Sequence, residues 1–160
     1  MVNLNNLKEW ADNDLFDLWI KLDREISRRG LSTSVGDIGE KVAIEFFNST
    51  PSLSNLIDAP KGAKNVDALS RDGERYSIKT QLKAKKTGTF YPDNKMPEKQ
   101  LFEYLVIVKL NSGYKLEAIH RFSWEVFIEI RAWDKRMNAW YVPISKKKME
   151  VGEKLFPKKN

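Results

Sequence analysis

The stretch that decides the fold is residues 65–82, NVDALSRDGERYSIKTQL. Its centre holds Asp72-Gly73, and this dipeptide supplies the positive backbone φ angles that a tight hairpin turn needs. The turn is flanked by residues 66–69 and 74–82, which are rich in strand-forming types. The sequence therefore predicts two antiparallel strands joined by a tight turn, with Asp67 on the first strand.

Side chains of the second strand alternate between two faces, because successive residues of a strand point to opposite sides. Ser77, Lys79 and Gln81 share one face, and Tyr76 and Ile78 share the other. A carboxylate on one strand and a lysine on its neighbour are thus expected to meet on one side of the sheet.

A second hairpin and several helices extend this core. The turn Asn111-Ser112-Gly113 separates strand-like residues 101–110 from 114–120, and Ser123 is placed to cap a helix. Apolar residues at three- and four-residue spacings predict helices at 4–29 and 35–48. We expect residues 48–64 and 87–99 to be mostly loop, and residues 140–142 to form a last short strand.

Length and composition indicate one globular domain. The chain has 160 residues, 41% of them hydrophobic, and no cysteine, which excludes disulfides, thiolate nucleophiles and cysteine-based zinc sites. We expect an α/β domain over residues 1–150, including the N-terminal helices at 4–29, and a basic tail at 151–160. Residues 1–21 do not resemble a secretory signal, and no apolar run is long enough to span a bilayer, so we expect a soluble cytoplasmic protein without a membrane partner.

The acidic and basic residues of the hairpin suggest phosphodiester chemistry. A divalent cation such as Mg²⁺ takes oxygen ligands, and one or two carboxylates together with a substrate phosphate can hold it. A lysine beside the ion can stabilise negative charge on the phosphate. Asp67 and Lys79 supply one carboxylate and the lysine, and Glu40, near the start of the helix at 35–48, is the candidate for the second carboxylate.

Three segments together resemble the PD-(D/E)xK nuclease superfamily, and in detail its small type II restriction endonucleases. They are residues 36–43 (GDIGEKVA), 65–68 (NVDA) and 76–79 (YSIK). The resemblance implies a restriction-endonuclease-like mixed sheet flanked by helices. It also implies that Glu40 and Asp67 are metal ligands and that Lys79 is the catalytic lysine.

One position departs from the superfamily pattern. Ser77 stands where the superfamily usually has Glu, Asp or Gln, and a serine hydroxyl is a poor metal ligand. Some members with serine at this position take the missing carboxylate from a helix. The resemblance therefore implies that Glu40 supplies it, and Ser77 is kept as a candidate catalytic residue. Asp37 and Glu45 compete with Glu40 for the helix position.

Each of these residues also has a structural interpretation. Asp67 and Lys79 taken singly are compatible with a turn-side carboxylate and an exposed strand lysine, so only their combination favours a site. Five further residues are candidate nucleic-acid contacts: Lys64, Gln81, Lys83, Lys85 and Lys86. An exposed polar strand residue would equally explain Gln81, whereas Lys83, Lys85 and Lys86 are better explained as phosphate contacts than as a solvated strand edge. The single histidine, His120, fits a structural role better than a zinc site.

The sequence thus predicts a metal-dependent endodeoxyribonuclease that uses Mg²⁺, or Mn²⁺ in its place, and hydrolyses duplex DNA. Cutting two strands favours a homodimer with two sites. Two alternatives remain: an inactive restriction-endonuclease-like module that binds DNA or a protein partner, and a nuclease that acts on RNA.

Overall fold

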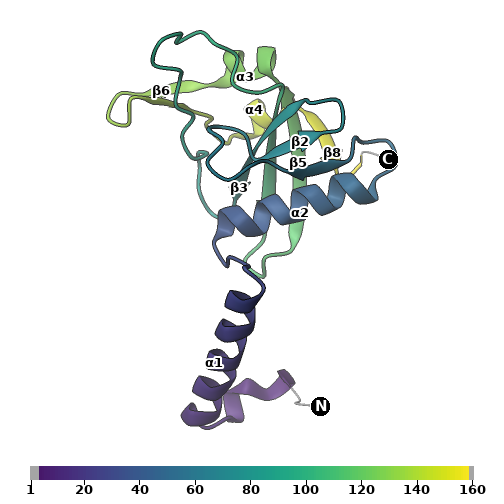
Figure 1. Ribbon diagram of the computed structural model, residues 1–160, viewed down its shortest axis with the longest axis vertical. Helices are drawn as coiled ribbons and strands as arrows, with labels where there is room; N and C mark the ends of the chain where they lie inside the picture. Colours follow the sequence, from purple (N-terminus) through teal and green to yellow (C-terminus); the bar gives the residue numbers. More distant parts are fainter. Residues whose placement is uncertain (1–3, 159–160) are drawn as a thin grey trace. The chain divides into compact units, whose positions relative to one another are not determined.

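The computed structural model describes residues 4–158 and divides the chain into two compact units, with the boundary between Ser34 and Val35 (Figure 1). Each unit is described by itself. Within residues 4–158, no helix has the length and apolar character needed to cross a membrane.

The first unit is helical, as the sequence predicts. It contains a 3₁₀ segment, η1 (Leu4–Glu9), and the longer helix α1 (Asp12–Arg28). Glu25 accepts from Arg28 and Arg29 one turn later, at 2.7 and 2.6 Å. Gly30, with φ of 63°, ends the helix because its left-handed backbone costs a glycine little.

The second unit is a mixed α/β structure built on a six-stranded sheet (Figure 1). The strand order is β1-β2-β3-β4-β5-β8, and every neighbouring pair is antiparallel except β3 and β4, which are parallel. The strands of this sheet are β1 (Leu56–Asp58), β2 (Ala68–Ser70), β3 (Arg75–Gln81), β4 (Tyr104–Leu110), β5 (Leu116–Ser123) and β8 (Glu153–Phe156).

Three helices and a small ribbon complete the unit. The helices are α2 (Val35–Ser49), α3 (Trp124–Ile130) and α4 (Lys146–Glu150), and the two-stranded ribbon is formed by β6 (Ala132–Asp134) and β7 (Ala139–Tyr141). Ser123 caps α3 by accepting from the Val126 N–H, so the predicted cap is confirmed.

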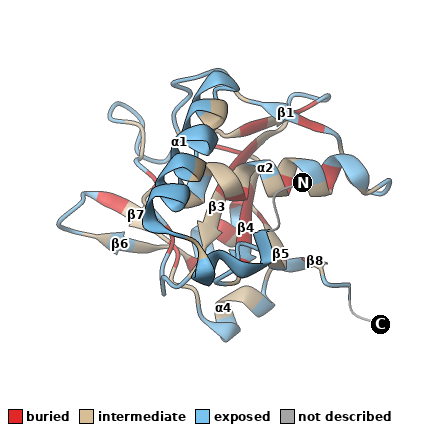
Figure 2. Cartoon of the chain, turned by 90° about the horizontal axis from the view of Figure 1, so that it is seen from below, coloured by how far each residue is buried: buried red, intermediate tan, exposed pale blue. Residues whose placement is uncertain are grey.

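The sheet is buried on both faces, and the central strands carry most of the buried residues (Figure 2). Tyr76 and Ile78 of β3 pack with Phe47 of α2 on one face. The opposite face packs Leu105 and residues of α3 into a second apolar cluster. The predicted alternation along β3 is therefore confirmed, and both predicted hairpins are present.

Two short strands were not anticipated by the sequence. Residues 48–64 are mostly loop, as expected, but they also contain the edge strand β1, whose Leu56 is buried. The expected basic tail over 151–160 contains β8, which pairs with β5 and buries Leu155, while residues 159–160 lie outside the described part. Two apolar residues, Leu155 and Phe156, between charged residues and a proline were too weak a signal for a strand.

The contact between α2 and β3 depends on Gly39, which is buried against Thr80. A Cβ at residue 39 would lie 2.6 Å from the Thr80 Cβ, closer than atoms can pack. Gly36, one turn earlier on the same helix, has no atom within 4 Å of such a Cβ.

We predict that Gly39→Ala lowers the free energy of unfolding by about 1–3 kcal/mol, because overpacking must displace the helix or the strand. Gly36→Ala should be neutral or stabilising by up to about 1 kcal/mol, because alanine favours the helix and meets no neighbour. Urea unfolding of both variants measures the difference. Equal effects of the two substitutions would contradict the tight contact.

Candidate active site at the open edge of β3

Asp67 lies immediately before β2, which begins two residues later than the sequence suggested, and backbone hydrogen bonds hold Asp67 in place. Its N–H donates to the Tyr76 carbonyl at 2.8 Å, and its own carbonyl accepts from the Ala59 N–H at 2.9 Å. Its Oδ2 accepts from the Ile78 N–H at 2.6 Å. Asn65, with φ of 59°, turns the chain just before this point. The carboxylate is therefore fixed against the edge of β3.

The pairing between β2 and β3 ends next to Asp67. β2 and β3 pair at Ala68–Tyr76 and Leu69–Arg75, and within residues 4–158 no strand pairs with β3 on that side beyond Tyr76. The Ile78 N–H is satisfied by the Asp67 side chain in place of a backbone carbonyl. The carbonyl of a strand residue points to the same edge as its N–H, so the Ile78 carbonyl oxygen also faces the open edge.

Helix α2 brings Glu40 to the same edge. Gly39 packs directly on Thr80, and the Thr80 hydroxyl is 3.5 Å from the Gly36 carbonyl, so the first turns of α2 lie against the second half of β3. Glu40 follows Gly39 on the helix and is half-buried. The two predicted ligands thus come from a helix and from the residue preceding a strand.

The pKa of Glu40 responds to burial and to several neighbouring charges. The pKa of Glu40 is raised to about 7, chiefly by burial and then by the negative charges of Asp67, Asp37 and Asp58, while the positive charge of Lys79 acts to lower it. Carboxylates that crowd one another in this way favour the protonated form. The structure therefore places Glu40 within electrostatic range of Asp67 and Lys79, and their action as one catalytic site stays a prediction.

Lys79 lies on the face of β3 that is opposite to α2. It shares the face of Ser77 and Gln81, and its Nζ lies 4.8 Å from the centre of the Phe90 ring. Glu40 belongs to the helix on the opposite face, and its pKa nevertheless responds to the positive charge of Lys79. The expectation that Asp67 and Lys79 share one face of the sheet stays a prediction.

Ser77 is not presented to the open edge. Its side chain is fully buried, and within residues 4–158 its Oγ has no hydrogen-bond partner. A buried hydroxyl without a partner costs about 1–3 kcal/mol. Nothing in this geometry makes Ser77 a metal ligand, and the role predicted for it stays a prediction.

The donor set fits a cation that also takes ligands from substrate and water. Within residues 4–158, no three acidic, histidine or cysteine side chains are grouped closely enough to form a metal-binding set. Mg²⁺ is commonly held by one or two carboxylates plus substrate phosphate and water. Glu40 and Asp67, with the outward-facing Ile78 carbonyl, match that requirement.

Two of the predicted nucleic-acid contacts are engaged within the protein. Gln81 donates from Nε2 to the Ala84 carbonyl at 2.9 Å. Lys86 lies 3.4 Å from Asp134 and over the Tyr141 ring at 4.9 Å. Gln81 therefore shapes the end of β3, and Lys86 ties the following segment to the ribbon.

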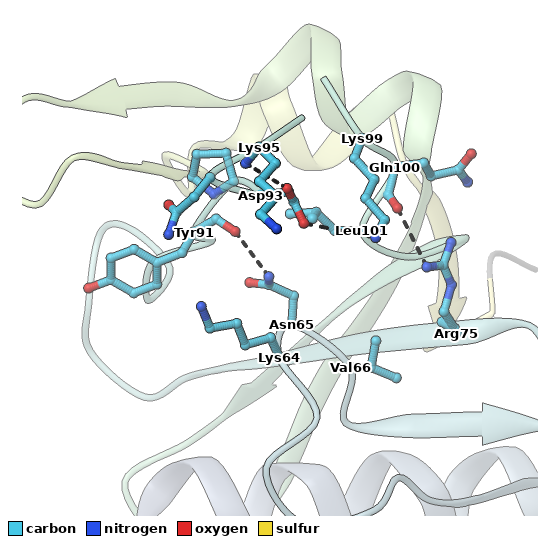
Figure 3. Close-up of a pocket in the computed structure, with 12 residues that line it drawn as sticks. Lys64, Asn65, Val66, Arg75, Tyr91, Asp93, Lys95, Lys99, Gln100 and Leu101 are labelled. Carbon is cyan, nitrogen blue, oxygen red and sulfur yellow. Dashed lines mark hydrogen bonds and ion pairs between the residues drawn. The ribbon is translucent and has the colours of Figure 1, made fainter. Parts of the chain in front are cut away.

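Lys83 and Lys85 follow β3 and are exposed, as a phosphate-contacting segment would be. Lys64 lies in a separate cavity of about 460 Å³ beside the loop of residues 91–101 (Figure 3). Asn65 closes one side of this cavity by donating to the Tyr91 carbonyl at 3.1 Å. Its charged lining residues are Lys64, Arg75, Asp93, Lys95 and Lys99.

One acidic residue near the site, Asp58, was not predicted from the sequence. Asp58 lies on β1 opposite Ala68, and its charge contributes to the raised pKa of Glu40. The only signal was its place between apolar Ile57 and Ala59, because β1 itself was not anticipated. His120 lies elsewhere on β5, and its pKa is lowered by burial and by Lys154.

The raised pKa of Glu40 predicts a specific pH dependence of stability. The unfolded carboxyl has a pKa of 4.5, so between pH 4.5 and about 7 the folded protein holds a proton that the unfolded chain has lost. Stability from this group is present below pH 4.5 and is lost as pH rises through 7.

We therefore predict that Glu40→Gln unfolds at a higher temperature than the wild type at pH 8 and close to the wild type at pH 4.5. The difference at pH 8 should be on the order of 1 kcal/mol, below the full linkage value because Glu40 is partly exposed. Thermal unfolding of both proteins at the two pH values tests this. If the variant and the wild type differ in unfolding temperature by the same amount at pH 4.5 and pH 8, the prediction is refuted.

The chain matches no model of a known protein family, and no curated protein sequence matches it. The chemical case for the site therefore rests on the residues of the chain itself.

Proposed function

We propose that this protein is a Mg²⁺-dependent endonuclease of the type II restriction enzyme kind, with a restriction-endonuclease-like fold, and that it hydrolyses phosphodiester bonds of duplex DNA. The observation that carries this proposal is the convergence of Glu40 and Asp67 beside Lys79 at an unpaired strand edge.

Crowded carboxylates favour a cation. Asp67 is fixed by the Ile78 N–H, and α2 packs on β3. The pKa of Glu40 is raised first by burial and then by the negative charge of Asp67 and its acidic neighbours. A divalent cation between them would remove that repulsion. Strongly shifted pKa values of this kind are enriched at functional sites.

The residues have distinct roles in the proposed hydrolysis. Glu40 and Asp67 would hold Mg²⁺, or Mn²⁺ in its place, and such an ion neutralises phosphate charge and lowers the pKa of bound water. Lys79 donates to a phosphate oxygen and stabilises the negative charge that grows there. Water adds to phosphorus, the bond from phosphorus to the 3′ oxygen breaks, and that oxygen takes a proton.

DNA contact is proposed for the segment that follows β3. Lys83 and Lys85 are exposed directly after the strand that carries Lys79. A DNA phosphate backbone bound at the site would therefore run close to both lysines. Basic side chains of this kind position a protein on phosphates without reading the bases.

We further propose a homodimer, because cleavage of both strands needs two sites. In the first unit α1 exposes Phe16 at 63%, Trp19 at 63% and Leu22 at 52%. Its first half is acidic, and its second half is mixed with a small excess of basic residues, so two copies in antiparallel orientation would pair acidic residues of one helix with basic residues of the other. The acidic residues of the first half are Asp12, Asp14 and Asp17, and the basic residues not paired with Glu25 are Lys21 and Arg24.

We predict that the wild type converts duplex DNA to fragments in the presence of Mg²⁺, and that Lys79→Ala and Asp67→Asn each reduce the rate by at least about 100-fold. The reason is that one variant loses transition-state charge stabilisation and the other a metal ligand. Gel analysis of long duplex DNA measures the rate. Lys115→Ala, an exposed lysine in the β4–β5 turn, is the matched control and should cut normally.

The same assay separates the alternatives. RNA and single-stranded DNA are incubated in parallel, and preferential cleavage of RNA would favour the RNA-acting nuclease. Calorimetric titration with Mn²⁺ reports on the site without cleavage. A wild type that binds DNA but neither binds Mn²⁺ nor cuts any substrate would be the inactive DNA-binding module.

For the proposed dimer we predict that Trp19→Asp shifts the protein from dimer to monomer in sedimentation analysis, because a charge replaces an exposed aromatic in the apolar surface. Tyr114→Asp, an exposed aromatic in the β4–β5 turn, is the control and should remain dimeric. A wild type that is monomeric at all concentrations, with or without DNA, would contradict the dimer.

A further inference from the structure

The β6–β7 ribbon is a feature that the proposed chemistry does not use. Its strands pair at Ala132–Tyr141, Trp133–Trp140 and Asp134–Ala139. Residues 135–138, between the strands, are all exposed, and the ribbon projects from the body of its unit (Figure 1). An isolated two-stranded hairpin is only marginally stable in water, so a projecting ribbon needs support.

The support comes from aromatic and cationic side chains. Trp133 and Trp140 face each other across the strands in an edge-to-face arrangement with ring centres 4.8 Å apart. The Arg131 guanidinium lies 3.8 Å from the Trp140 ring centre. Cross-strand aromatic pairs and stacked guanidinium groups both stabilise such a ribbon. The ribbon is therefore preorganised before any partner arrives.

Backbone bonds join the ribbon to the candidate active site. The Phe90 N–H donates to the Trp140 carbonyl at 2.8 Å, and the Trp140 N–H donates back at 2.9 Å. The Phe90 ring lies beneath the Lys79 ammonium at 4.8 Å. The Lys86 ammonium also contacts Asp134 of β6. The position of the ribbon is thus fixed relative to the catalytic strand.

The tip of the ribbon is basic, and its two cationic side chains have no partner within the described residues. Asp134 Oδ1 accepts from the N–H groups of Arg136 and Met137, each at 3.0 Å, which shapes the turn. In the described part of the chain, the side chains of Lys135 and Arg136 form no hydrogen bond or ion pair. Lysine and arginine in this setting suit a polyanion, and arginine in particular suits the guanine edge.

The dimensions fit a groove of duplex DNA. Three residues of a strand span roughly 10 Å, and two paired strands lie about 4.8 Å apart. The major groove is about 12 Å wide and 8.5 Å deep and admits a two-stranded ribbon, whereas the minor groove is about half as wide. We propose that the β6–β7 ribbon enters the major groove of duplex DNA and contacts it through Lys135 and Arg136. This inference rests on the proposed function and deepens it.

Binding can be measured apart from cleavage. The protein is titrated into a fluorescently labelled duplex, in a buffer that contains Ca²⁺ and has one fixed salt concentration. Fluorescence anisotropy then gives the Kd of the duplex for the wild type and for Lys135→Ala/Arg136→Ala. We expect the double variant to bind roughly tenfold more weakly or worse. Arg71→Ala/Lys115→Ala removes the same charges from two exposed turns and should bind like the wild type.

The groove is assigned by competition. Methyl green, which occupies the major groove, should displace the wild type, whereas netropsin, which occupies the minor groove, should not. Displacement by netropsin alone would overturn the major-groove assignment. Thermal unfolding checks that the double variant is folded. The single variant Arg136→Ala provides a second test of the contact between the ribbon and DNA.

The outcomes distinguish the two proposals. If the wild type binds and cuts duplex DNA while the ribbon double variant binds equally well, the ribbon inference is overturned and the endonuclease proposal stands. If the wild type neither binds nor cuts any duplex, the endonuclease proposal fails and the ribbon inference fails with it.

Discussion

The hydrogen bond from the Ile78 N–H to the Asp67 carboxylate is the contact on which the candidate site depends. At this point β2 stops pairing with β3, and a side chain replaces the backbone carbonyl that would continue the ladder. The replacement satisfies a backbone donor at the strand edge and keeps the rest of that edge open. One carboxylate therefore ends the strand pairing and also marks the place where a cation could bind.

The two apolar clusters deliver the other groups to this edge from opposite sides of the sheet. The cluster under α2 sets the distance between Glu40 and β3. The cluster under α3 contains Phe90. The Phe90 ring contacts the Lys79 ammonium, and the Phe90 backbone forms two hydrogen bonds with Trp140 of the ribbon. Glu40 is positioned by the packing of α2, Lys79 by β3, and Asp67, which precedes β2, by its hydrogen bonds to β3 and Ala59.

Sequence reasoning predicted the hairpins and the helices correctly because their signals are local. Asp72-Gly73 defines one turn, and alternation along β3 separates Ser77 from Ile78. The strands β1 and β8 were missed because each is short and is held by long-range pairing. The burial of Ser77 and the approach of Asp58 could not be predicted either, since both depend on tertiary contacts.

The dipeptide Gly39-Glu40 explains how a site can form although residue 77 is a serine. A carboxylate at the fully buried position 77 would lose its solvation without a partner, which is far costlier than a buried hydroxyl. A second carboxylate must therefore reach the edge from another element. Helix α2 can approach only because Gly39 has no Cβ to meet Thr80, and the next residue is the glutamate. The glycine permits the close contact, and Glu40 uses it to reach the edge that Asp67 leaves open.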